Sequence, residues 1–173
     1  MAAEDSRRRL IVLRHAKAER SGPTDHEREL SAAGRRDAGE VGRRLRAARL
    51  HPDLAIVSTS TRTRQTWQEV AAELGAPTTE RFEPGVYDNE MADLLELVRA
   101  TPDSAHTLLV VGHNPSIEEL ASQLDDGRGE AAARRAMAAG FATSAFAVLG
   151  HGGSWRLVAP GQLRIESFVP RRG

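Results

Sequence analysis

Two histidines and two arginines stand where apolar runs of the chain end. Arg14 and His15 come directly after a run of Leu, Ile and Val, His113 ends a second such run, and Arg62 lies just beyond a third. An imidazole can act as a nucleophile, or as an acid and base near neutral pH. A guanidinium binds a planar or tetrahedral oxyanion through two parallel hydrogen bonds. These residue types together predict chemistry on a phosphoryl group.

The apolar runs themselves predict how these side chains are positioned. Runs of this length that are rich in Val, Ile and Leu are typical of strands buried on both faces of a parallel sheet. We expect such strands at residues 9–14, at residues 54–57 and from Thr107 onward. In open α/β sheets, ligands bind at the carboxyl ends of the strands. The two histidines and two arginines should therefore converge on one pocket.

Helices and further strands are expected between and after these runs. The predicted helices cover residues 31–50, with Ser31 as the N-cap, and then residues 62–74, 91–100 and 116–124. The predicted strands are a short one at 78–82, two at 144–149 and 155–158 joined by a hairpin at 150–153, and one at 163–169. Signals for loop and helix conflict over residues 125–139. The alternation predicts an α/β fold, a three-layer α/β/α sandwich around a mostly parallel sheet, built as a single domain over residues 1–173.

Composition narrows the function classes. The chain has 173 residues, a hydrophobic content of 40% and a net charge of zero. No run approaches the roughly 20 apolar residues that span a bilayer, and the first residues are polar, so we expect a cytoplasmic protein without a membrane partner. Zero net charge argues against nucleic acid as a partner. Nothing in the pattern predicts an oligomeric state.

Several chemistries are excluded or disfavoured by residue type. The chain has no cysteine, which excludes disulfides and thiolate nucleophiles. It also has no close cluster of His, Asp and Glu at metal-ligand spacing, so no metal or other cofactor is expected. All but one of the 24 basic residues are arginine, Lys17 being the exception. Codon preference explains most of that bias, so an arginine is informative only by its position.

Position in the chain distinguishes Arg62 from the other basic residues. It also distinguishes His15 and His113, which lie at strand ends, from the other four histidines. A positive charge at the start of a helix opposes the helix dipole, so Arg62 needs a reason such as an anionic partner. In contrast, His26, His51, His106 and His151 fall in predicted loops or strand starts. We expect these four to be solvated.

Four motifs in order carry a resemblance to a known family. They are Arg-His at 14–15, Leu-Ser-Ala-Ala-Gly at 30–34, Ser-Thr-Ser-Thr-Arg-Thr-Arg-Gln-Thr at 58–66 and Gly-His-Asn-Pro at 112–115. The chain resembles the histidine phosphatase superfamily over essentially its whole length, and within it the small SixA-like phosphohistidine phosphatases. The resemblance implies the phosphoglycerate mutase-like fold.

The resemblance also implies residue roles. His15 is the expected nucleophile, forming a phosphohistidine that water hydrolyses without a metal. Arg14, Arg62 and His113 are the expected phosphate pocket, with His113 polarising the phosphoryl oxygens. Ser58 is a further candidate that orients the pocket, and Lys17 is a candidate for substrate contact.

The sequence departs from the family pattern at two positions and leaves the general acid open. Ala16 replaces the signature glycine, which requires a negative φ at that position, and Thr59 replaces the usual proline. Larger family members take a general acid from the loop after the third strand, where this chain offers Glu83, Asp88 or Glu90. We rank Glu83 first. A phosphohistidine substrate has an easily protonated leaving group and depends less on such an acid.

Three hypotheses follow for the function. The first is a phosphatase that acts on phosphohistidine in a partner protein, because strands and helices use nearly all of the chain and leave little for a lid. The second keeps the chemistry but takes a small phosphate ester or nucleotide-like metabolite. The third is a non-catalytic phosphate-binding module, which the retention of all four residues disfavours.

Overall fold

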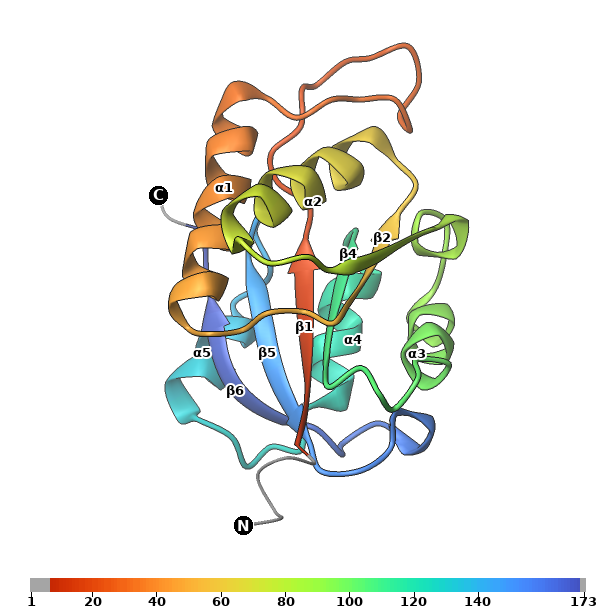
Figure 1. The fold of residues 1–173 in the computed structure, drawn as a ribbon, viewed down its shortest axis with the longest axis vertical. Coiled ribbons are helices and arrows are strands. Elements are labelled where there is room, and N and C mark those ends of the chain that lie inside the picture. The colour runs from red at the N-terminus through yellow and green to blue at the C-terminus, as the bar shows by residue number, and fades with distance from the viewer. Residues whose placement is uncertain (1–6, 172–173) are drawn as a thin grey trace.

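The computed structural model describes residues 7–171, and Figure 1 shows the arrangement of its elements. The strands are β1 (Arg8–Arg14), β2 (Leu54–Ser58), β3 (Thr79–Glu83), β4 (Thr107–Gly112), β5 (Phe146–His151) and β6 (Arg164–Val169). The helices are α1 (Ala32–Ala47), α2 (Thr61–Leu74), α3 (Met91–Arg99), α4 (Ser116–Leu124) and α5 (Ala131–Ala138). Two short 3-10 helices are η1 (Pro84–Val86) and η2 (Trp155–Leu157).

The strands form one six-stranded sheet in the order β3-β2-β4-β1-β5-β6. Strands β1 to β4 are parallel to their neighbours among themselves, whereas β5 runs antiparallel to both β1 and β6. Helices α1 and α2 lie side by side on one face, and α3 and α4 cover the other (Figure 1). This arrangement confirms the expected three-layer sandwich around a mostly parallel sheet.

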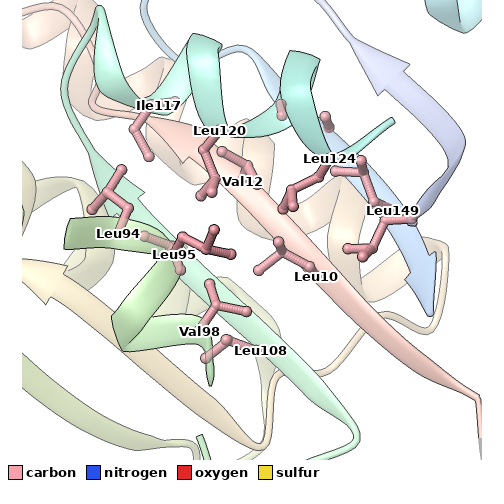
Figure 2. Close-up of a cluster of buried hydrophobic side chains, with 14 of the residues drawn as sticks. Leu10, Val12, Leu94, Leu95, Val98, Leu108, Ile117, Leu120, Leu124 and Leu149 are labelled. Atoms are coloured by element: carbon pink, nitrogen blue, oxygen red, sulfur yellow. The ribbon is translucent and has the colours of Figure 1, made fainter. Parts of the chain in front are cut away.

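Alternation along β1 explains why its sequence reads as a continuous apolar run. Leu10 and Val12 pack with α3 and α4 (Figure 2), whereas Ile11 and Leu13 pack with α1 and α2. All four side chains are fully buried. Successive residues of a strand point to opposite faces, so a strand covered on both sides needs an apolar residue at every position. The same rule makes residues 54–57 of β2 and residues 108–111 of β4 apolar at every position.

The start of α1 is fastened to the segment that follows β1. Ser31 is the N-cap, as expected, and its hydroxyl accepts a hydrogen bond from the backbone N–H of Gly34 at 3.0 Å. The Ser31 N–H donates to the Lys17 carbonyl at 2.9 Å. A Cβ atom at Gly34 would lie 2.0 Å from that same carbonyl oxygen. The Leu-Ser-x-x-Gly motif thus holds α1 against the segment after His15.

The predicted strand at 155–158 and its hairpin are wrong. Residues 155–157 form η2, and β5 continues to His151 and pairs with β6 instead. Trp155 and Val158 are buried while Leu157 is exposed, which is a three-residue spacing and not an alternation. Trp155 is held in the core because its indole N–H donates to the Ala105 carbonyl at 2.7 Å. His151, expected to be solvated, is buried near this turn.

The signals for loop and helix conflict over residues 125–139 because this segment contains a loop followed by a helix. Asp125 forms an isolated bridge with Leu163, Gly127 has a φ of 77°, and the alanines then form α5. The side chain of Glu130 caps this helix by accepting from the N–H groups of Ala132 and Ala133. Across residues 7–171, every helix is too short or too polar to cross a bilayer.

Candidate active site

Three neighbouring strands bring the candidate residues together at their carboxyl ends. Strand β4 lies between β2 and β1, with Arg14 opposite Gly112 and Val57 opposite Val111 in the register. His15, His113 and Ser58 therefore follow one another across adjacent strand ends. The imidazole rings of the two histidines lie with their centroids 5.2 Å apart. The predicted convergence follows from parallel pairing.

His15 is held in one tautomer. Its Nδ1 lies 2.7 Å from the carbonyl oxygen of Ala16, and because a carbonyl can only accept, Nδ1 carries the proton and Nε2 keeps its lone pair. Burial lowers the pKa of His15 from 6.5 to about 4, and the positive charges of Arg62 and Arg14 act in the same direction. At neutral pH the ring is uncharged, with Nε2 available as a nucleophile.

His113 is also oriented through both ring nitrogens. Its Nδ1 lies 3.3 Å from an Nη of Arg62, and its Nε2 lies 2.8 Å from the hydroxyl of Ser58. Arginine is only a donor, so Nδ1 accepts and Nε2–H donates to Ser58. Burial, followed by the effects of His15 and Arg62, lowers the pKa of His113 from 6.5 to about 3. A dianion beside Nδ1 would raise that pKa and allow the same nitrogen to become a donor.

The two arginines supply buried donors. Arg62, in the first turn of α2, is only 6% exposed, and Arg14 is half-buried with an Nη donating to the Phe141 carbonyl at 2.8 Å. The Nε–H of each arginine is buried and has no hydrogen-bond partner among residues 7–171. Buried donors are normally paired, so these two N–H groups are available to an oxyanion.

The similarity to known proteins agrees with this geometry. A model of the histidine phosphatase superfamily (branch 1) matches residues 10–84. A protein of Mycobacterium tuberculosis named only as uncharacterized is 38% identical over 162 residues, covering 92% of this chain and 100% of that one. The Nakamurella multipartitia structure named "putative phosphohistidine phosphatase SixA" is 31% identical, with a TM-score of 0.84, and the match covers 96% of this chain and 98% of that one.

The chain belongs to the histidine phosphatase superfamily.

A second structure of a putative phosphohistidine phosphatase SixA, from Agrobacterium tumefaciens, is 29% identical with a TM-score of 0.78, covering 94% of this chain and 97% of that one. Membership supports a phosphatase function and accounts for the order of the four motifs.

This histidine phosphatase tolerates both departures from the family pattern. Ala16 is fully buried, and it is not among the non-glycine residues with positive φ in the described chain, which are Arg49 and Ser144. Thr59 adds a contact that a proline could not make, because its hydroxyl lies 3.0 Å from Nε2 of His26. His26 is thus half-buried at the site and not solvated as expected.

The three candidate general acids either have other partners or are exposed. The carboxylate of Glu83 forms an ion pair with Arg81 at 2.5 Å. Glu90 takes part in a capping box at the start of α3, and Asp88 is exposed. Lys17 is exposed too, and its backbone carbonyl is the atom that contacts Ser31. The roles of Glu83 and Lys17 stay predictions.

Three residues at the site carried no role in the sequence interpretation. Thr66 accepts the N–H of Ala16 at 3.0 Å and donates to the Arg62 carbonyl at 2.7 Å, which joins α2 to the peptide after His15. Asp25 accepts from both Arg62 and Tyr87. Thr66 lies inside a motif and could have been found there, whereas Asp25 and Tyr87 lie in loops without a periodic signal.

The described chain offers no alternative metal centre. No group of three or more His, Cys, Asp or Glu within residues 7–171 is arranged to hold a metal ion.

Proposed function

We propose that the chain is a phosphatase that transfers a phosphoryl group to His15 and then hydrolyses the resulting phosphohistidine. The observation that carries the proposal is the Nδ1–H tautomer of His15 together with two buried guanidinium Nε–H donors that have no hydrogen-bond partner within residues 7–171. Phosphoryl transfer needs little from a protein beyond positioning and charge stabilisation. The site supplies both without a metal.

The reaction proceeds in two steps. In the first, Nε2 of His15 attacks phosphorus, the bond from phosphorus to the leaving group breaks, and the leaving group takes up a proton from solvent, which is returned when phosphate forms from water in the second step. Arg14, Arg62 and His113 bind the phosphoryl oxygens. In the second step, water attacks phosphorus, the bond from phosphorus to His15 breaks, and inorganic phosphate leaves with neutral His15 restored.

We propose that the substrate is phosphohistidine in a partner protein and that the reaction takes place in the cytoplasm. Two similar structures are named as putative phosphohistidine phosphatases SixA. The connections beside the site are the segment between β1 and α1 and the short segment around η1, and neither contains a further helix or strand that could form an inserted lid. A leaving imidazole accepts a proton readily, so this substrate also fits a site in which Glu83 is paired with Arg81.

Comparison of two substrate classes tests the proposal. A phosphohistidine-bearing protein and a panel of small phosphate esters are incubated with the wild type, with His15→Ala and with His51→Ala, in which an exposed histidine is removed as the control. We expect the protein to be dephosphorylated by the wild type and His51→Ala but not by His15→Ala. Much faster turnover of a small ester would instead favour the metabolite alternative, and full activity of His15→Ala would contradict the mechanism.

A further inference from the structure

Asp25 lies where three parts of the molecule meet around Arg62. It belongs to the segment between β1 and α1, Arg62 to the first turn of α2, and Tyr87 to the turn after η1. We propose that Asp25 is a positioning residue that holds the guanidinium of Arg62 in its phosphate-binding orientation, and that Tyr87 holds Asp25. The inference rests on the proposed function in one respect, namely that Arg62 binds the phosphoryl group.

The donors of Arg62 are divided between the protein and the pocket. One Nη donates to the backbone carbonyl of Asp25 at 2.8 Å. The other lies 3.2 Å from the Asp25 carboxylate and 3.3 Å from Nδ1 of His113. Nε–H has no partner among the described residues. Asp25 thus holds the outer side of the guanidinium while a donor remains for an oxyanion.

A long side chain needs such contacts to stay in one orientation. Ordering an arginine side chain costs conformational entropy, and positive charge at the start of α2 is opposed by the helix dipole. The carboxylate of Asp25 restricts the side chain of Arg62 and offsets its positive charge. It supplies the anionic partner that the position of Arg62 requires, and its two contacts with Arg62, through backbone and side chain, fix the plane of the guanidinium.

Tyr87 in turn restrains Asp25. Its hydroxyl donates to Oδ2 of Asp25 at 2.8 Å, the same oxygen that accepts from Arg62. Its ring packs edge-on against His113, with centroids 5.5 Å apart, and the Arg62 guanidinium lies 6.0 Å from the ring centroid. The hydrogen bond joins the two loops beside the site.

The protonation state of Asp25 fits this role. The hydrogen bond from Tyr87, followed by the charge of Arg62, lowers the pKa of Asp25 from 3.8 to about 2, although its side chain is 58% exposed. Asp25 is therefore a carboxylate throughout the neutral range. It also forms an ion pair with Arg28 at 3.0 Å, so a test must separate positioning of Arg62 from general stability of the loop.

Vanadate inhibition and aryl phosphate turnover provide that test. The proteins are the wild type, Asp25→Asn, Tyr87→Phe and, as the control, Glu27→Gln, which removes an exposed carboxylate from the same loop. Losing one charge-assisted contact should weaken vanadate inhibition and lower kcat/KM about tenfold in Asp25→Asn, with a smaller loss in Tyr87→Phe. Glu27→Gln should match the wild type, and the melting temperatures should stay close together.

The same substitution made in an Arg62→Lys variant shows whether Asp25 acts through Arg62. In Arg62→Lys, which lacks the guanidinium fork, adding Asp25→Asn should change the vanadate inhibition constant by less than about twofold. An equal loss in both backgrounds would overturn the proposal, and so would wild-type inhibition by vanadate in Asp25→Asn. A wild type without phosphatase activity would instead contradict the proposed function itself, together with this inference, so the two failures are distinguishable.

Discussion

At the scale of single residues, the chemistry of the site depends on which ring nitrogen of each histidine carries the proton. His15 donates from Nδ1 to a backbone carbonyl, and His113 donates from Nε2 to Ser58. Both hydrogen bonds use groups of the protein, so the tautomers are set before a substrate arrives. Nε2 of His15, the proposed nucleophile, thereby keeps its lone pair, and Nδ1 of His113 accepts from Arg62.

The first prediction concerns the titration of these two rings. Burial beside two arginines opposes protonation, so neither ring should titrate near the ordinary value of 6.5. We expect pKa values of about 4 for His15 and about 3 for His113, measured from ¹⁵N chemical shifts of the imidazoles in the free protein. Titration of His15 near 6.5 would show that the ring is solvated and not held as described.

The residues that the sequence could and could not predict differ in what positions them. Arg14, His15 and His113 follow strand ends, and parallel pairing alone brings strand ends together. Asp25 and Tyr87 lie in loops, and their hydrogen bond depends on how two connections far apart in the sequence fold toward each other. No spacing in the sequence predicts this contact between the two loops.

At the scale of elements, the placement of Arg62 depends on how α2 packs against α1. The two helices touch at Gly42, where a Cβ atom would lie 2.5 Å from the carbonyl oxygen of Val70. Gly39, one turn earlier on the same helix, has room, because its nearest atoms would lie 3.5 Å away or more. The two glycines form a matched pair for testing the helix contact.

The second prediction uses this pair. Gly42→Ala should force α1 and α2 apart and lower the free energy of unfolding by about 1–3 kcal/mol, as overpacking does. Gly39→Ala should leave it unchanged or raise it by up to about 1 kcal/mol, because alanine is the better helix former. Urea denaturation of both variants measures the difference. Equal stability of the two variants would show that the helices do not approach as closely as described.

Element types were predicted best where one periodic signal dominated. The buried strands and the helix after Ser31 were found because their burial is regular. Residues 155–158 were misassigned since the burial of Trp155 depends on a pocket under α3 and on the carbonyl of Ala105, neither of which the local pattern shows. Element α5 was left ambiguous because glycines precede its alanines closely.

At the scale of the whole molecule, the active site makes the fold sensitive to acid. The pKa values of His15 and His113 are lower in the folded protein than the ordinary 6.5. Between pH 6.5 and about 4 the unfolded chain therefore binds more protons than the folded one, and stability falls as the pH falls. Each buried histidine can contribute on the order of 3 kcal/mol across that window.

The third prediction follows from this linkage. The free energy of unfolding of the wild type should decline from pH 7 to about pH 4, and His15→Asn, which cannot titrate, should show a shallower decline. Below about pH 4, carboxylates with lowered pKa, Asp25 among them, add their own loss. Denaturation at a series of pH values measures both curves. Parallel curves for the two proteins would contradict burial of a neutral His15.

We propose that His15 carries the phosphoryl group during turnover. Rapid quenching of the wild type with a phosphohistidine-bearing protein, followed by mass spectrometry of the digested enzyme at alkaline pH, locates that group. We expect an acid-labile phosphoryl group on His15, absent from His15→Ala, which should also lose turnover. A phosphoryl group on another residue, or turnover by His15→Ala at the wild-type rate, would rule out this mechanism.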